Sequence, residues 1–392
     1  MEELFTFTTI ELIGLGLIVS LCIIQVIYYL VVYFRPYRFE KKKRIEVPSS
    51  VSSGLPVSVI VYAKNESYNL QRNLPSLLTQ DYPDYEVIVI NDGSTDESED
   101  VLKLLENEYK HLYHTFIPQE SKYLSRKKLA LTVGIKAAKN DTLLFIEANC
   151  YPVGKNWIRS MVEQYEPDTE IVLGFCSYPE TKGFFHKLVS YDNLLSGLKY
   201  LSAALAGYPY KGSGRNLSYR KDLFFRNKGF RNSLSLHAGE DDLFINTNAN
   251  KKNTKVVYSP ESMTEMISFP RFSMWKEMKV SRAATQRFYK GGTLTFFRLQ
   301  TFSFFCFLFS VMLAVIAGLY GNPLLAGTAV FLYLLLYLTK AIILKKSARM
   351  LNQKPLSAWL PVLEIVLPIF NVYVRIYRKF RGKKDFTFTM GR

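Results

Sequence analysis

Glu147 and Asn149 stand directly after Thr142 to Ile146, a short and nearly continuous apolar run. Such a run is typical of a buried strand in a parallel sheet, and ligands of open α/β sheets bind just beyond the carboxyl ends of the strands. Side chains alternate along a strand, so Glu147 and Asn149 are predicted to face one crevice. Their oxygen atoms suit a divalent cation, Mg²⁺ or Mn²⁺, that would neutralise a pyrophosphate leaving group. Solubility of the strand end is the alternative.

Two further polar groups follow apolar runs that are predicted to be strands. Asn65 and Glu66 come after Val57 to Tyr62, and Asp92 comes after Tyr85 to Ile90. At the same edge of a sheet, Asn65 and Glu66 would line the crevice for a nucleotide, and Asp92 would accept hydrogen bonds from a nucleobase or ribose. The competing interpretation is a polar turn with a helix cap, because Asp, Asn, Gly and Ser favour turns.

Two basic groups suit the phosphates of such a nucleotide. Lys128 closes the sequence Ser-Arg-Lys-Lys at the start of a predicted helix, where backbone amides and cations would meet a diphosphate. Arg282 belongs to a second basic stretch, which follows Trp275 and suits a phosphate, the membrane surface, or both. A solvated basic face is the alternative for any single lysine.

Three adjacent carboxylates, Glu240, Asp241 and Asp242, follow Gly239. They repel one another, so the cluster is costly unless it caps a helix, binds a cation or is solvated. We interpret Asp241 as a general base that removes a proton from an acceptor hydroxyl, with helix capping as the alternative. The glycine-rich stretch Gly212 to Tyr219 is predicted to be a tight turn or a place where the backbone approaches a ligand closely.

The elements that must position these side chains alternate between strands and helices. Strands are predicted at residues 57–62, 85–90, 114–117, 142–146, 171–175 and 255–258, and helices at 70–78, 97–109, 127–138, 184–205 and 241–248. This alternation indicates an α/β fold with a doubly wound, mostly parallel sheet.

Apolar runs flank this region on both sides. Leu12 to Phe34, Phe302 to Tyr320 and Leu324 to Leu344 are each about long enough to cross a hydrocarbon core, which takes roughly 20 helical residues. The run Leu356 to Val374 contains Glu364 and two prolines. An interfacial or re-entrant element is therefore favoured there over a full span.

The formal net charge of the 392-residue chain is +16, and much of its Lys and Arg content lies beside the apolar runs. A basic chain attracts nucleic acid, acidic lipid or phosphorylated substrates, but this placement favours the membrane over nucleic acid. Basic stretches after the first run and after Leu344 place both of these ends in the cytoplasm. We therefore expect a multi-pass protein of the cell membrane whose catalytic domain is cytoplasmic, joined to the first run by a Ser- and Gly-rich linker at 48–56.

Read together and in order, these groups resemble the family 2 inverting glycosyltransferases. The resemblance covers roughly Pro56 to Arg282. It rests on Val-Ser-Val-Ile-Val-Tyr-Ala-Lys-Asn-Glu (57–66), Asn-Asp-Gly-Ser-Thr-Asp (91–96), Lys-Lys-Leu-Ala-Leu (127–131), Glu-Ala-Asn-Cys (147–150) and Gly-Glu-Asp-Asp-Leu-Phe (239–244). It implies a nucleotide-sugar-binding fold of the A type, a nucleotide diphosphate leaving group, a divalent metal and inversion at the anomeric carbon. It also implies that Asp92 contacts the nucleoside and that Asp241 is the base.

Two positions depart from the family pattern. The paired aspartates, Asp-x-Asp, appear as Glu147-Ala148-Asn149, and the neutral amide predicts weak metal binding. The Gln-x-x-Arg-Trp element appears as Lys279 to Ala283, without the tryptophan seen in processive polysaccharide synthases. Transfer of a single sugar is therefore favoured over polymer extrusion.

The sequence thus predicts a membrane-bound glycosyltransferase that moves a sugar from a nucleotide diphosphate to a membrane lipid, a lipid-linked sugar or a nascent glycan. The rival hypotheses are a non-catalytic protein that binds nucleotide sugar and a subunit of an export assembly. Four regions are expected: a transmembrane helix with its basic flank (1–46), a cytoplasmic glycosyltransferase domain (47–270), an amphipathic interface segment (271–300), and transmembrane and interfacial helices (301–392).

Overall fold

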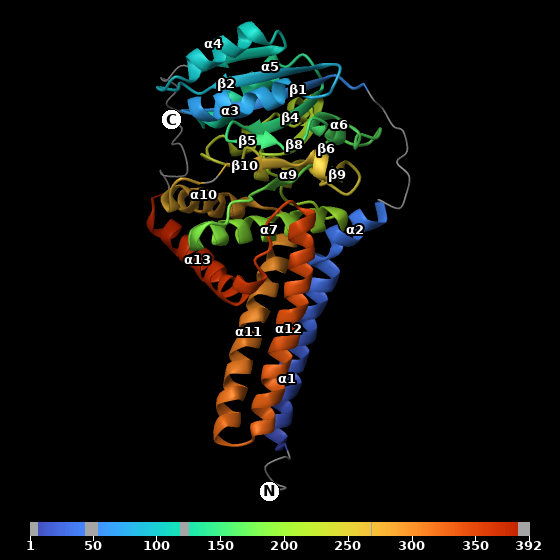
Figure 1. Ribbon diagram of the computed structural model, residues 1–392, viewed down its shortest axis with the longest axis vertical. Coiled ribbons are helices and arrows are strands. Elements are labelled where there is room, and N and C mark those ends of the chain that lie inside the picture. The colour runs from blue at the N-terminus through green and yellow to red at the C-terminus, as the bar shows by residue number, and fades with distance from the viewer. Residues whose placement is uncertain (1–6, 44–53, 118–124, 268, 383–392) are drawn as a thin grey trace.

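The computed structural model describes residues 7–43, 54–117, 125–267 and 269–382. Figure 1 shows an α/β head above a bundle of long helices. Two further helices, α7 (Gly183–Leu205) and α10 (Phe272–Thr285), lie across the junction between the head and the bundle. The predicted boundary between residues 46 and 47, and most of the predicted linker, lie outside the described residues.

The head is built on a seven-stranded sheet with the strand order β3-β2-β1-β4-β8-β6-β9. Neighbouring strands are parallel, except that β8 is antiparallel to both β4 and β6. The strands are β1 (Val57–Ala63), β2 (Tyr85–Asn91), β3 (Leu112–Phe116), β4 (Thr142–Glu147), β6 (Ile171–Leu173), β8 (Leu217–Arg220) and β9 (Thr254–Val256). The predicted α/β fold with a mostly parallel sheet is confirmed.

The central strands are buried on both faces, as their continuous apolar sequences require. On one face, α5 (Arg126–Ala137) lies so close that a Cβ atom on Gly134 would meet the side chains of Ile60 and Ile90. The chain runs outward from β1 to β2 and β3 and returns to β4 on the opposite side of β1. This reversal creates a crevice at the carboxyl ends of β1 and β4.

Two parts of the head differ from the sequence prediction. β8 includes the last three residues of the stretch 212–219, which the glycines predicted to be a turn, and its residues are largely buried in the sheet. A second sheet of three short strands, β5 (Cys150–Pro152), β10 (Thr264–Met266) and β7 (Cys176–Ser177), was not predicted. These strands are too short to produce a recognisable alternation in the sequence.

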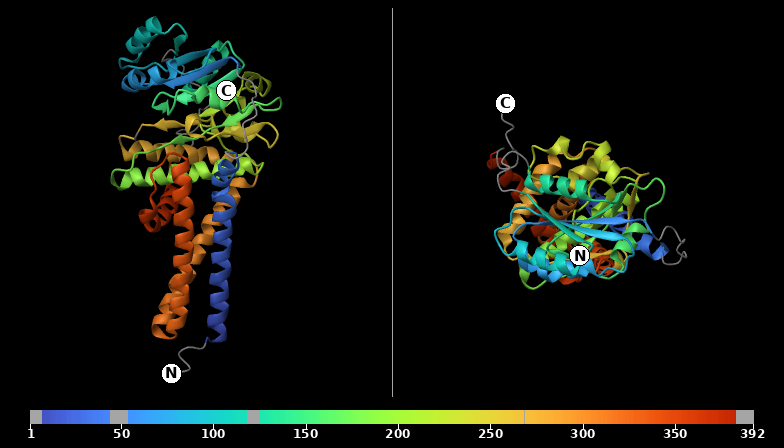
Figure 2. Two further views of the ribbon diagram at one scale, coloured as in Figure 1. Left: turned by 45° about the vertical axis from the view of Figure 1, so that its right-hand side comes forward. Right: turned by 90° about the horizontal axis from the view of Figure 1, so that it is seen from above.

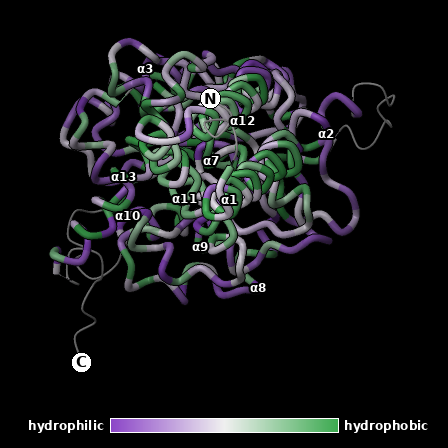
Figure 3. Tube along the Cα trace, turned by 90° about the horizontal axis from the view of Figure 1, so that it is seen from below, coloured by the Kyte–Doolittle hydropathy of each residue, from purple (hydrophilic) through white to green (hydrophobic). Residues whose placement is uncertain are grey.

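The bundle consists of α1 (Thr9–Ile27), α11 (Thr293–Tyr320) and α12 (Pro323–Met350), which contact one another and run side by side in Figure 1 and in the left view of Figure 2. Seen from below, these helices are predominantly hydrophobic (Figure 3). Together with the segment Ser357–Phe380, four described helices are long and apolar enough to cross a membrane.

α13 (Leu360–Phe380) does not run along the bundle but slants away from its head end and packs on α10 (Figure 1). The rings of Trp275 and Phe370 stack there with centroids 4.7 Å apart. Lys340 of α12 and Glu364 of α13 form a buried ion pair, with 2.9 Å between Nζ and Oε2. The oblique path suits an interfacial element, which stays a prediction for this segment.

Candidate active site

Asp92 lies at the carboxyl edge of the sheet, where its amide donates a hydrogen bond to the carbonyl oxygen of Ala63 at 2.9 Å. Its side chain is only 1% exposed. The Tyr62 hydroxyl donates to Oδ2 at 2.8 Å, and Nε of Arg126 donates to Oδ1 at 2.7 Å. Asp92 therefore has a fixed orientation, and its charge is balanced by the first residue of α5.

Asn65 and Glu66 form the loop between β1 and α3 (Ser67–Leu78). Asn65 has a φ of 52°, a left-handed conformation that asparagine tolerates, and its Oδ1 accepts a hydrogen bond from the Thr95 amide at 2.8 Å. Asn65 thus joins the loops that follow β1 and β2. Burial raises the pKa of Glu66, and the negative charge of Glu147 adds to this effect.

Glu147, at the end of β4, is shared by two cations. Nζ of Lys127 lies 2.7 Å from Oε1, and Nε of Arg215 lies 2.9 Å from Oε2. Burial by itself would raise the pKa of Glu147, but Lys127 and Arg215 outweigh it and hold that pKa well below its ordinary value. Glu147 therefore stays ionised at physiological pH.

Lys127 also joins Glu147 to the acidic cluster, because its Nζ lies 2.9 Å from Oε1 of Glu240. Both carboxylates line one small cavity together with Gly214 and Asp241. Oε2 of Glu240 is buried and accepts no hydrogen bond from any residue that the structure describes. A buried carboxylate oxygen without a donor is costly, so the hydroxyl group of a ligand would fit here.

Asp241 is held at the start of α9 (Asp242–Asn248), facing this cavity. Its Oδ1 accepts a hydrogen bond from the Asp242 amide at 2.6 Å, and its Oδ2 accepts one from the Gly214 amide at 2.9 Å. Gly239 precedes the cluster with a φ of 103°, a conformation that favours glycine and turns the chain toward the cavity. Helix capping and a role in the cavity are thus compatible for Asp241.

Asp242 has different surroundings, since its side chain is buried and points toward α10. Its Oδ2 accepts hydrogen bonds from the hydroxyls of Thr285 at 2.6 Å and Tyr289 at 2.7 Å. Burial, and next the negative charge of Asp241, raise the pKa of Asp242 to about 6. Asp242 therefore anchors the acidic cluster to the segment beneath the head.

Lys128 does not face the crevice, which contradicts the phosphate contact predicted for it. Its side chain is fully buried, and its ammonium group donates to the carbonyl oxygens of Ser233, Leu236 and Ala238. An ammonium group has three donors, so none remains for a ligand. Successive side chains on a helix point about 100° apart, and it is Lys127 that faces the crevice.

Arg282 is likewise separated from the nucleotide-facing residues with which the sequence analysis grouped it. It lies on α10 and lines a second, larger cavity together with Lys199 and Lys211. The predicted contact with a nucleotide phosphate therefore has no support from its position.

Strand alternation, which predicts that Glu147 and Asn149 face the same crevice, does not extend to Asn149. β4 ends at Glu147, and the chain turns at Ala148 and Asn149. Oδ1 of Asn149 accepts a weak hydrogen bond from the Cys150 thiol at 3.3 Å. Within the described ranges, no three His, Cys, Asp or Glu side chains form a cluster that could hold a metal ion.

Arg215 is a residue of the crevice that the sequence analysis did not single out. It follows Gly212-Ser213-Gly214 and is only 9% exposed. A buried carboxylate needs a cationic partner, so the presence of Glu147 at a strand end could have prompted a search for one. The sequence alone does not show which of the chain's many arginines reaches it.

Part of the chain matches the model of a known protein family. Residues 58–225 match the model of the family described as "Glycosyl transferase family 2". Glycosyltransferase GlyA of Streptococcus pneumoniae is 29% identical over 134 residues, which are 33% of this chain and 18% of that protein. The poly-beta-1,6-N-acetyl-D-glucosamine synthase of Staphylococcus aureus is 24% identical over 251 residues, 62% of this chain and 58% of the relative.

A solved structure has a similar fold over nearly all of both chains. It is the mannosyltransferase PcManGT of Pyrobaculum calidifontis in complex with GDP-Man and Mn²⁺, with a TM-score of 0.53 and 16% identity, covering 92% of this chain and 99% of the other. The chain spans less than two thirds of the length of the two curated relatives named above. The match therefore assigns residues 58–225, rather than the whole chain, to glycosyl transferase family 2.

Proposed function

We propose that this protein transfers a sugar from a nucleotide diphosphate donor to a membrane-associated acceptor, with inversion at the anomeric carbon. One observation carries the proposal: Asp92, Glu147 and Asp241 meet at the point of the sheet where the strand order reverses. Tyr62 connects them, because its hydroxyl donates to Asp92 and its ring lines the cavity of Glu147 and Asp241. The names of the relatives support sugar transfer.

The donor lies across the crevice in this proposal. Asp92 accepts hydrogen bonds from the nucleoside, since each carboxylate oxygen can accept a further bond beside those from Tyr62 and Arg126. Lys127 and Arg215 are the cations nearest to the position of the diphosphate, where they stabilise the negative charge of the leaving group. The free Oε2 of Glu240 accepts a hydrogen bond from a hydroxyl of the donor sugar.

Asp241 acts on the acceptor as the general base. It accepts the proton of the acceptor hydroxyl while the acceptor oxygen bonds to the anomeric carbon and the bond from that carbon to the diphosphate oxygen breaks. Because attack and departure take place on opposite faces in a single displacement, the configuration inverts. Two amide donors fix the orientation of the Asp241 carboxylate, which favours such a positioned role.

A divalent cation accompanies the donor in this proposal, as Mn²⁺ accompanies GDP-Man in the structure from P. calidifontis. Glu147 and Asn149 would hold it with their oxygens, and it would neutralise the charge of the departing diphosphate. Both oxygens of Glu147 already contact cations, and Asn149 has no charge. The residues therefore fit an ion that is held weakly and is bound mainly through the diphosphate.

The position of the head relative to the bundle supports cytoplasmic catalysis. The basic residues at the head end of α2 (Arg35–Lys43) and α12 lie on the side of the head, whereas the turn at Gly321 lies at the foot of the bundle (Figure 1). By the positive-inside rule, we place the head in the cytoplasm, and the division into four regions stays a prediction. An impermeant thiol reagent applied to intact cells should not label a cysteine introduced near Asp92, and labelling there would overturn this orientation.

The decisive experiment is a screen of radiolabelled nucleotide sugars with the purified full-length protein and a lipid extract of its cells. We expect one donor to yield a labelled lipid product of inverted configuration. Donor binding without transfer or hydrolysis would favour the non-catalytic alternative, and failure to bind any nucleotide diphosphate would favour a subunit of an export assembly.

A further inference from the structure

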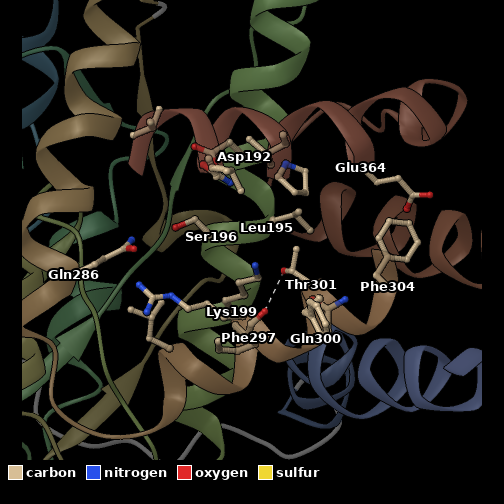
Figure 4. A pocket seen from close by; sticks show the side chains of 18 of the residues that line it. Asp192, Leu195, Ser196, Lys199, Gln286, Phe297, Gln300, Thr301, Phe304 and Glu364 are labelled. Atoms are coloured by element: carbon tan, nitrogen blue, oxygen red, sulfur yellow. Dashed lines mark hydrogen bonds between the residues drawn. The ribbon is translucent and has the colours of Figure 1, made fainter. Parts of the chain in front are cut away.

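A cavity of about 630 Å³ lies directly beneath the head, between the bundle, α7, α10 and α13. Figure 4 shows its interior, with Asp192, Ser196 and Lys199 of α7 facing Phe297 and other residues of α11. Its volume lies within the range of roughly 300–1,000 Å³ that is typical of small-molecule sites. The proposed donor site above does not use it.

The cavity has a large excess of positive charge. It is lined by the carboxylates Asp192 and Glu364 and by the cations Lys199, Lys211, Lys279, Arg282, Arg298, Lys340 and Arg375. Asp192 pairs with Lys279 at 2.7 Å, and Glu364 pairs with Lys340 at 2.9 Å. The other five cations form no ion pair with any carboxylate among the described residues.

Two lysines of the cavity, which lie outside the membrane segments, have lowered pKa values. Burial lowers the pKa of Lys199 to about 8, and burial followed by the charge of Arg282 lowers the pKa of Lys211 to about 7. Like charges gathered in a partly buried space repel one another. A multivalent anion in the cavity would relieve this repulsion.

The cavity also lies where the surface changes from charged to apolar. Along α11, Arg298 is followed one turn later by Phe302, which lines the cavity and is 68% exposed. On α13, Ile369 and Val372 line the cavity and are 57% and 51% exposed. Exposed apolar residues beside unpaired cations match a ligand with an anionic head and an apolar tail.

The cavity borders the proposed catalytic residues. Tyr289 lines it, and its hydroxyl donates a hydrogen bond to Oδ2 of Asp242, the neighbour of Asp241. Lys211 lines it as well, three residues before Gly214, whose amide holds Asp241. A ligand in the cavity is thus close to the crevice in which the donor is proposed to bind.

From these observations we propose that the cavity binds the phosphate or diphosphate group of a membrane lipid, and that this lipid is the acceptor through a hydroxyl group that it carries beyond the phosphate. The unpaired lysines and arginines bind the phosphate oxygens, and the lipid chain leaves the cavity between α11 and α13. The assignment of the lipid as acceptor rests on the proposed function, whereas the binding of its phosphate does not.

The test is a titration of the full-length protein in a maltoside detergent, which has no phosphate of its own. The probes are a long-chain alkyl monophosphate, the alcohol with the same chain, and inorganic phosphate. We expect the alkyl phosphate to bind more tightly than either of the others. The double variant Lys199→Gln/Arg298→Gln should weaken alkyl phosphate binding by about tenfold or more, because each lost charge-assisted hydrogen bond contributes substantially.

Two controls separate this effect from misfolding. Arg287→Gln removes an exposed cation that lies between α10 and α11 and does not line the cavity. This variant should bind the alkyl phosphate with wild-type affinity. The double variant should keep the wild-type affinity for a nucleotide diphosphate. Equal loss of nucleotide affinity would assign the cavity to the donor and overturn the proposal.

The other outcomes are equally clear. Inorganic phosphate that binds as tightly as the alkyl phosphate would make the cavity a site for free anions, and the alcohol binding as tightly would make it an apolar groove; either result overturns the proposal. If the proposed function fails, no donor is transferred, yet binding of the alkyl phosphate still depends on Lys199 and Arg298. The two failures are therefore distinguishable.

Discussion

The crevice above α7 and the cavity below it differ in whether their charged side chains have partners of opposite charge. In the crevice, the carboxylates of Asp92, Glu147 and Glu240 each contact a cation from α5 or from the segment before β8. In the cavity, most cations have no carboxylate partner among the residues described. A balanced site holds its own side chains in place before a ligand arrives, whereas an unbalanced one needs the ligand to supply the missing charge.

Asp241→Asn should have the largest effect, because it removes a proposed base from the balanced crevice without changing its shape. We expect the rate of transfer to fall by about 10²–10⁴-fold. The affinity for the nucleotide sugar should change by no more than a few fold, since the base acts on the acceptor. Transfer rates and donor binding measured on the same preparation check both statements.

Two variants serve as controls for this change. Asp242→Asn alters the neighbouring carboxylate, which does not line the crevice, and should retain more activity than Asp241→Asn. Asp92→Asn should instead weaken donor binding. Near wild-type transfer by Asp241→Asn would show that the proposed mechanism is wrong.

Replacing the two adjacent lysines of α5 separates binding from stability. Lys127→Met removes the cation between Glu147 and Glu240 and should weaken nucleotide diphosphate binding by about tenfold or more. Lys128→Met removes the ammonium donor that the carbonyl oxygens of Ser233, Leu236 and Ala238 share, and it should lower the free energy of unfolding by about 1–3 kcal/mol. Calorimetric titration and denaturant unfolding measure the two effects, and a binding loss in Lys128→Met at unchanged stability would reverse the assignment.

Asn149→Asp adds a carboxylate to the crevice and should lower the divalent cation concentration needed for half-maximal transfer. The expected change is a shift in metal affinity rather than in the maximal rate, because the proposed mechanism has the ion held mainly through the diphosphate. Manganese binding, measured by electron paramagnetic resonance with the nucleotide diphosphate present, gives a second readout. Full activity of the wild-type protein in excess chelator would contradict a metal role altogether.

The smallest expected effect is on the pH dependence of stability. Burial and the charge of Asp241 raise the pKa of Asp242 to about 6, above the value of about 3.9 for an unfolded aspartate. The folded protein therefore binds this proton more tightly, so the contribution of Asp242 to stability falls as the pH rises from about 4 to about 6. Asp242→Asn should flatten this part of the profile of thermal midpoint against pH. An unchanged profile would show that Asp242 titrates normally.

The central part of the fold could be predicted because short, nearly continuous apolar runs alternate with predicted helices from Val57 to Glu147. β8 could not, since the glycines before it suggested a turn and its pairing with β4 and β6 is a long-range contact. The site, too, could be predicted only where its residues follow a recognisable strand. The strand ends at Asp92 and Glu147 were found from their positions, but their partners Arg126 and Arg215 come from other elements. The cavity combines residues from both ends of the chain, and such a combination leaves no local pattern.

α7 has a consequence for how this protein can change. One side of the helix packs into the head, where a Cβ atom on Gly197 would collide with the ring of Phe175, and Lys199, two residues later, lines the cavity. A single inserted residue would rotate everything after it by about 100° and would disturb both surfaces at once. A shift of α7 would therefore change the packing of the head and the lining of the cavity together. We expect α7 to accept substitutions more readily than insertions.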